Sequence, residues 1–146
     1  MLIPISLISE VNDFMKGKAW LYLLPAIIWA VTLAILMLLP GESFPDSKLF
    51  SYDKLAHLGV FAILSGLVMF GSCRTNLFGR TKTALLVYPL IISIVYSAGL
   101  EYLQTFSPGR TSDVYDLIAN IAGAIFGVLV FYIFNKNKFA IYKLML

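Results

Sequence analysis

The chain has 146 residues, of which 60% are hydrophobic and 13% are charged, and its mean hydropathy is +0.86. These values exclude a soluble globular domain and indicate one small integral membrane protein. The formal net charge is +3, but the basic residues do not cluster on one soluble segment, so we expect no nucleic-acid binding. The single cysteine, Cys73, excludes an internal disulfide.

The N-terminal residues show an amphipathic pattern. Residues 6–16 place Leu7, Val11 and Phe14 on one helical face and polar side chains on the other. This is typical of a helix that lies in the membrane interface, although a frayed tail leaning on the membrane is an alternative. No basic start or small-residue cleavage site is present, so we expect no removable signal peptide. We assign residues 1–19 to an N-terminal interfacial amphipathic segment.

Four long apolar stretches follow this segment. The first has no charge, and Pro25 should either kink it or lie in its first turns. At a rise of 1.5 Å per residue, 20 residues cover the roughly 30 Å hydrocarbon core of a bilayer. The sequence therefore predicts an all-α fold, a polytopic four-transmembrane-helix bundle at residues 20–134, followed by a basic cytoplasmic tail at 135–146. The expected spans are residues 20–39, 53–71, 83–106 and 113–134.

The charges predict an orientation. Eight of the eleven Lys and Arg residues belong to the segments on the side of the two termini, and six of the eight acidic residues belong to the other side. By the positive-inside rule, both termini are expected in the cytoplasm. The second helix then starts, the third ends and the fourth starts on the outer side. We expect one shallow polar cluster there, made of His57, Glu101, Gln104, Arg110, Asp116 and Asn120.

Ionisable residues in apolar spans are functional candidates, because a bilayer makes them costly to bury. Glu101 and Gln104 share a helix face, and Arg110 is the nearest cation in sequence. Arg110 follows Ser107-Pro108-Gly109, whose Pro and Gly occupy the central positions of a type II turn. It either locks this loop by pairing with Glu101 or Asp116, or is held by them while its guanidinium faces an anionic ligand. Both interpretations can hold together.

Two further pairs, Asp53 with His57 and Asp116 with Asn120, are each four residues apart and share a helix face. Helix capping explains Asp53 and Asp113 better than it explains the deeper Asp116. His57 is either a hydrogen-bonded structural residue or, beside carboxylates, an acid/base or pH-sensitive group. One histidine with carboxylates is a poor transition-metal set, so we expect no metal site and no cofactor. A hydrolase triad is not supported.

Two sequence patterns concern helix packing. Gly123-x-x-x-Gly127 continues the helix face of Asp116 and indicates a close helix–helix seam. Residues 52–57 also resemble residues 115–120 at an offset of 63. Either this is an internal repeat, as in some transporters, or it is a coincidence of common residues.

Five motifs occur in order along the chain: Asp53-Lys54-x-x-His57, Glu101-x-x-Gln104, Pro108-Gly109-Arg110, Asp116-x-x-x-Asn120 and Gly123-x-x-x-Gly127. In these residues the chain resembles the VanZ-like family of small bacterial membrane proteins. The resemblance covers the second to fourth expected helices, and the first matches only as an apolar span. It implies a multi-pass protein of the bacterial cell (inner) membrane, of the type linked to low-level resistance to the lipoglycopeptide teicoplanin. It supplies no settled chemical mechanism.

The leading hypothesis is a membrane protein that binds or modifies an anionic amphiphile at the outer face. Membrane lipids, a lipid-linked cell-wall precursor or a lipoglycopeptide are the expected partners. Arg110 would hold the anionic group, with Glu101 and Asp116 positioning it. The remaining ligand-binding candidates are Gln104, Asn120, Asp53 and Lys54, and His57 supplies a further polar contact.

Two other hypotheses remain open at this point. The rival is an intramembrane enzyme, a transferase or hydrolase acting on a lipid, with His57 or Glu101 as the catalytic acid/base. The third is a purely structural partner of a larger complex, in which the polar cluster holds helices together. The sequence defines neither the ligand nor the oligomeric state.

Overall fold

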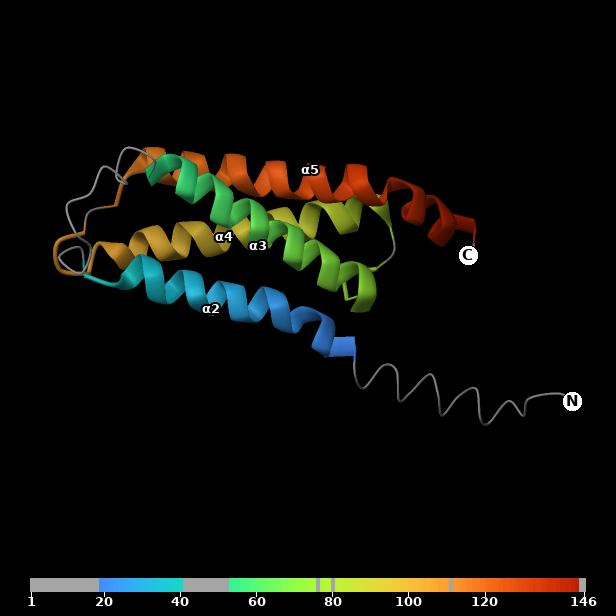
Figure 1. The fold of residues 1–146 in the computed structure, drawn as a ribbon, viewed down its shortest axis with the longest axis horizontal. Coiled ribbons are helices and arrows are strands. Elements are labelled where there is room, and N and C mark those ends of the chain that lie inside the picture. The colour runs from blue at the N-terminus through green and yellow to red at the C-terminus, as the bar shows by residue number, and fades with distance from the viewer. Residues whose placement is uncertain (1–18, 41–52, 76, 80, 111, 145–146) are drawn as a thin grey trace, which may run out of the picture.

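The computed structural model describes residues 19–40, 53–75, 77–79, 81–110 and 112–144, with side chains described between residues 20 and 136 of these ranges. The described residues form a bundle of helices (Figure 1), which confirms the all-α prediction. In chain order they are the 3₁₀ helix η1 (Ala19–Leu23) and the α-helices α2 (Leu24–Leu38), α3 (Asp53–Thr75), α4 (Lys82–Gln104) and α5 (Val114–Leu144).

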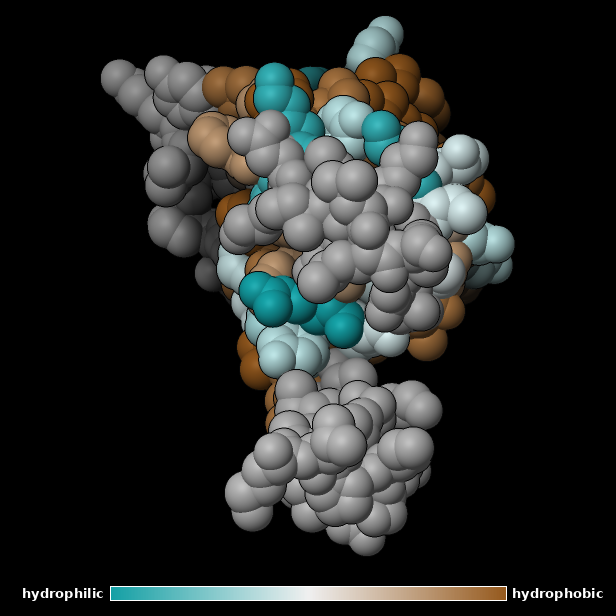
Figure 2. Space-filling model, turned by 90° about the vertical axis from the view of Figure 1, so that its right-hand side faces the viewer, coloured by the Kyte–Doolittle hydropathy of each residue, from teal (hydrophilic) through white to brown (hydrophobic). Residues whose placement is uncertain are grey.

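Four of the described helical segments are long and apolar enough to cross a membrane: Trp20–Leu38, Asp53–Thr75, Lys82–Gln104 and Val114–Lys136. Many of their large hydrophobic side chains, such as Ile28, Val95 and Ile133, are exposed. Seen from the end where α5 finishes, brown hydrophobic residues lie around the sides of the bundle (Figure 2). Such a surface suits lipid chains, and it confirms the predicted four-helix polytopic fold.

The helix ends refine the predicted bounds. Pro25 lies in the first turn of α2, where its missing N–H removes no helical hydrogen bond. α3 continues to Thr75, beyond the predicted end at residue 71. α5 continues to Leu144, so the predicted basic tail is helical through that residue. Residues 1–18 of the predicted interfacial segment and most of the first loop lie outside the described residues.

α3 and α5 begin at the same end of the bundle and pack closely against each other (Figure 1). A Cβ on Gly123 would lie 2.8 Å from the carbonyl carbon of Leu58, and one on Gly127 would lie 2.7 Å from that of Ala62. These separations leave no room for a side chain, so the two backbones approach directly. The predicted glycine seam is confirmed.

One hydrophobic core cluster lies between α2, α3 and α4, and its buried members are Ala26, Leu33, Met37, Phe61, Leu64, Val68 and Leu100. Two side-chain hydrogen bonds join the middle of α2 to its neighbours. The indole N–H of Trp29 donates to the Val60 carbonyl at 3.0 Å, and the Tyr96 hydroxyl donates to the Ala30 carbonyl. These contacts fix the position of α2 along α3 and α4. The candidate site lies at one end of α3, α4 and α5.

Candidate functional site

A buried polar network connects three helices at the end of the bundle where α3 and α5 begin and α4 ends. His57 Nδ1 lies 3.0 Å from Asn120 Oδ1, and Asn120 Nδ2 donates to Glu101 Oε1 at 3.2 Å. Asn120, Glu101 and His57 are only 0%, 5% and 9% exposed, respectively. One asparagine side chain of α5 therefore joins the histidine of α3 to the glutamate of α4.

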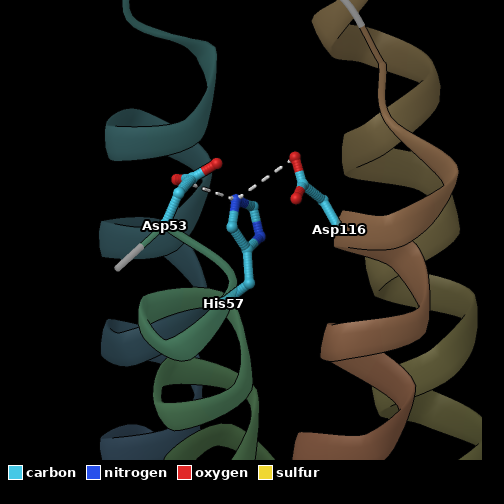
Figure 3. Close-up of side chains that lie close together, drawn as sticks. All are labelled: Asp53, His57 and Asp116. Atoms are coloured by element: carbon cyan, nitrogen blue, oxygen red, sulfur yellow. Dashed lines mark ion pairs between the residues drawn. The ribbon is translucent and has the colours of Figure 1, made fainter. Parts of the chain in front are cut away.

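The Asn120 amide also fixes the orientation of the imidazole. Because its NH₂ group donates to Glu101, its oxygen faces His57 Nδ1, which therefore donates. The other ring nitrogen, Nε2, points between two carboxylates (Figure 3). It lies 3.7 Å from Asp53 Oδ1 and 3.9 Å from Asp116 Oδ2, and both distances are longer than a hydrogen bond.

Lys54 joins two acidic residues at the rim of this network. Its Nζ lies 2.9 Å from both Asp113 Oδ2 and Asp116 Oδ1. Asp113 precedes the spanning part of α5, and its hydrogen bonds from Lys54 and the Tyr115 amide lower its pKa below the ordinary value. The Tyr115 N–H donates to Asp113 Oδ1 at 2.8 Å. The predicted capping role of Asp113 is thereby confirmed.

Gln104 and Arg110 lie at the same end of the bundle, but their recorded side-chain hydrogen bonds reach α2. Gln104 Nε2 donates to the Met37 carbonyl at 3.1 Å, and Arg110 Nε donates to the Leu39 carbonyl at 3.3 Å. The last carbonyls of a helix have no helical partner, and a cation there is favourable. Both side chains therefore help to close the end of α2.

The turn before Arg110 has the expected form. The Arg110 N–H donates to the Ser107 carbonyl at 3.2 Å, and Gly109 has a φ of 70°, as the third position of a type II turn requires. Arg110 was expected to pair with Glu101 or Asp116. The basic side chain recorded in an ion pair with Asp116 is Lys54, which lies one turn before His57 on α3.

The serines of α4 were not singled out from the sequence. Ser93, Ser97 and Glu101 follow one another at four-residue intervals, and both serines are fully buried. Ser93 donates to the Pro89 carbonyl at 2.8 Å. Among the described residues, Ser97 Oγ and Glu101 Oε2 are buried without a hydrogen-bond partner. Their four-residue spacing is visible in the sequence, but it is weak evidence for a buried polar row, because serine in a helix often bonds its own backbone.

The residues related by the 63-residue offset meet in space. His57 contacts Asn120, and the carboxylates of Asp53 and Asp116 both face the His57 ring. The similar sequences therefore occupy matching first turns of two helices that run side by side, α3 and α5.

Apolar helices long enough to cross a membrane, with a buried polar network at one end, define a small polytopic membrane protein. The chain belongs to the VanZ/LLP1 family, whose sequence model matches residues 1–135.

A relative from fission yeast, Schizosaccharomyces pombe, is described as the uncharacterized protein C11E3.10. It is 30% identical over 86 residues, which cover 59% of this chain and 50% of that protein. The chain thus spans about half the length of the curated relative that it matches. No solved structure matches the chain.

Proposed function

We propose that this protein acts at the outer face of a cell membrane, where its polar end binds the anionic head of an amphiphile. The observation that carries the proposal is the buried His57–Asn120–Glu101 network. Ionisable side chains are costly inside a spanning segment and are usually retained for function. The network lies where the helices end, which is the depth of lipid heads.

Lys54 is the main anion-binding residue in this proposal. Its side chain is 54% exposed, and its contacts with Asp113 and Asp116 use two of its three N–H donors. The third can reach a phosphate or carboxylate. Arg110 adds positive charge at the same end of the bundle. The exposed apolar side chains of Leu55 and Ile118 offer surface to the lipid tails.

The orientation of the protein is part of the proposal. Basic residues concentrate on the side of the two termini, which supports a cytoplasmic location for both. The polar end then faces the cell exterior. In a bacterial inner membrane, the ligand would be a lipid-linked cell-wall precursor or a lipoglycopeptide such as teicoplanin, and binding would contribute to antibiotic resistance. The similarity to a fission-yeast protein favours chemistry common to both kinds of cell, a phosphate-bearing lipid.

A second candidate function is an intramembrane transferase or hydrolase that acts on a lipid. The orientation of His57 favours it, because Asn120 holds Nδ1 while Nε2 faces away from the network. A ring fixed in this way can accept or donate a proton at Nε2, and Glu101 can serve as the second acid/base group.

Native mass spectrometry of the purified protein with phosphatidic acid tests the binding proposal. Lys54→Gln should weaken binding at least about tenfold, because a charge-assisted hydrogen bond contributes roughly 1.5–3 kcal/mol. Lys82→Gln is the matched control, since Lys82 is an exposed lysine at the opposite end of the bundle. Equal affinity of Lys54→Gln and wild type, or equal affinity for phosphatidylcholine, would contradict the proposal.

The enzyme candidate has a separate test. Lipid extracts from membranes containing wild type or Glu101→Gln are compared by mass spectrometry. A new lipid product that appears only with wild type supports the enzyme, whereas identical extracts count against it.

A further inference from the structure

The edge of the His57 ring that faces away from Asn120 points at two carboxylates instead of a hydrogen-bond donor. With its proton on Nδ1, Nε2 presents a lone pair toward Asp53 and Asp116 (Figure 3). Three electron-rich atoms therefore face one another, and among the described residues no hydrogen bond reaches Nε2. His57 is nine-tenths buried. A cation or a proton between these atoms would satisfy all three.

The distances from Nε2 to the two carboxylates indicate whether a proton or a metal ion fits better between them. A protonated ring would draw a carboxylate to about 2.7–2.9 Å. The recorded distances from Nε2 are 3.7 Å to Asp53 and 3.9 Å to Asp116. A metal ion with bonds of about 2.0–2.2 Å separates its donor atoms by about 3–4 Å. The arrangement is therefore closer to a set of metal ligands than to an imidazolium ion pair.

We propose that Asp53, His57 and Asp116 bind one divalent transition-metal ion. Their donor atoms all lie within 4.8 Å of one another. The Asp53 side chain is 40% exposed and lies in the first turn of α3, so it is free to shift toward a bound ion. One imidazole and two carboxylates suit Mn²⁺, Fe²⁺ or Zn²⁺ and leave coordination positions open for water or a ligand.

The surroundings of these three residues resemble the outer shell of a metal site. A metal-binding histidine usually donates its other N–H to an oxygen that fixes the ring. Here Asn120 Oδ1 is that oxygen, and Glu101 holds the Asn120 amide in turn. Lys54 binds Asp116 Oδ1 while Asp116 Oδ2 faces His57. Two of the three donors are thus held in place before any ion binds.

The charge balance also favours a divalent ion. Asp53 and Asp116 bring two negative charges to the His57 ring, and Lys54 shares its one positive charge between Asp116 and Asp113. One divalent ion would offset the two carboxylate charges of the donor set. The sequence predicted no metal because one histidine with carboxylates is a poor transition-metal set, and that expectation remains untested. The structure adds that two carboxylates face the same ring nitrogen of His57.

Direct cation binding tests this inference without any lipid, so its outcome is separate from that of the proposed function. The full chain in a Cys73→Ser background, with a tag free of histidine, is purified in detergent and stripped with a chelator. Zn²⁺ binding is measured by calorimetry and by elemental analysis. Bound Mn²⁺ is examined by electron spin echo spectroscopy, which detects a coordinated imidazole nitrogen.

Wild type should bind one ion per chain, with nitrogen coupling to Mn²⁺. Asp53→Asn and His57→Gln should each weaken binding at least tenfold, and His57→Gln should remove the nitrogen coupling. Asp113→Asn is the matched control, because the Asp113 side chain is also 40% exposed and lies outside the donor set. It should change the affinity less than about threefold.

Gel filtration and circular dichroism confirm that each variant is folded. Should His57→Gln fail this check, the half-exposed Asp53→Asn variant and the wild-type Mn²⁺ spectrum still decide the question. Less than one ion per chain at saturation would overturn the inference. So would wild-type affinity in Asp53→Asn, or a Mn²⁺ spectrum without nitrogen coupling.

Discussion

The hydrogen bond between Glu101 and Asn120 should contribute measurably to stability. Both residues are buried, and the amide is the hydrogen-bond partner recorded for Oε1 of the carboxyl group. Asn120→Ala would leave the carboxyl group without this donor and would leave His57 Nδ1 without its acceptor. Glu101→Ala would remove the carboxyl group and leave the amide NH₂ unpaired. Removing both side chains avoids part of this penalty.

Two sets of magnitudes bear on the size of this coupling. In soluble proteins, leaving a buried polar group unpaired costs roughly 1–3 kcal/mol. Side-chain hydrogen bonds between membrane helices average about 0.6 kcal/mol in double-mutant cycles and reach about 1.7 kcal/mol. Glu101 Oε2 has no hydrogen-bond partner among the described residues, so the bond that Asn120 donates to Oε1 should lie at the upper end of this range. We expect a coupling free energy of about 1.5 kcal/mol between these two positions.

The measurement is reversible unfolding of four proteins in mixed micelles: wild type, Asn120→Ala, Glu101→Ala and the double variant. The double variant should be less destabilised than the sum of the single variants, by the coupling free energy. Distant, independent sites add to within about 0.3–0.5 kcal/mol. Additivity within that margin would show that the two side chains do not interact in the folded protein.

Two further predictions concern the helix seam and the rim of the site. Gly123→Ala should lower the free energy of unfolding by about 1–3 kcal/mol, because its Cβ would collide with the Leu58 backbone. Gly99→Ala, with open space around it, is the control and should stabilise by up to about 1 kcal/mol through helix propensity; equal effects would refute the seam. Because Lys54 lowers the pKa of Asp113, their pair should stabilise the fold above the ordinary pKa of Asp113. This contribution should disappear as the pH falls through the lowered pKa, and Asp113→Asn should remove that part of the acid dependence in pH-dependent unfolding.

The clustering of the polar residues was predictable because it follows from chain connectivity. Spans that alternate in direction bring the start of one helix, the end of the next and the start of the third to the same side. His57, Glu101 and Asn120 therefore had to lie at similar depth. The type II turn and the glycine seam were also predictable from the sequence, because Gly109 and Gly123 occupy positions that other residues fill poorly.

The pairing of individual side chains was less predictable. The sequence suggested Arg110 as the partner of the buried carboxylates, since it is close to them along the chain. The basic side chain that pairs with the buried Asp116 is Lys54, and Arg110 donates to a carbonyl at the end of α2. The nearness of Lys54 to Asp116 depends on how α3 packs on α5, which separation along the chain does not reveal.

The amino-acid sequence by itself indicated the four described helices that are long and apolar enough to cross a membrane, with their polar residues gathered at one end. Helix length and hydropathy are local properties, and connectivity fixes which helix ends share a side. The tertiary structure alone decided which way each helix turns its faces, and so placed the His57 ring between Asp53 and Asp116. A helix that is apolar all round carries little signal for its own rotation, and close packing against neighbouring helices sets it.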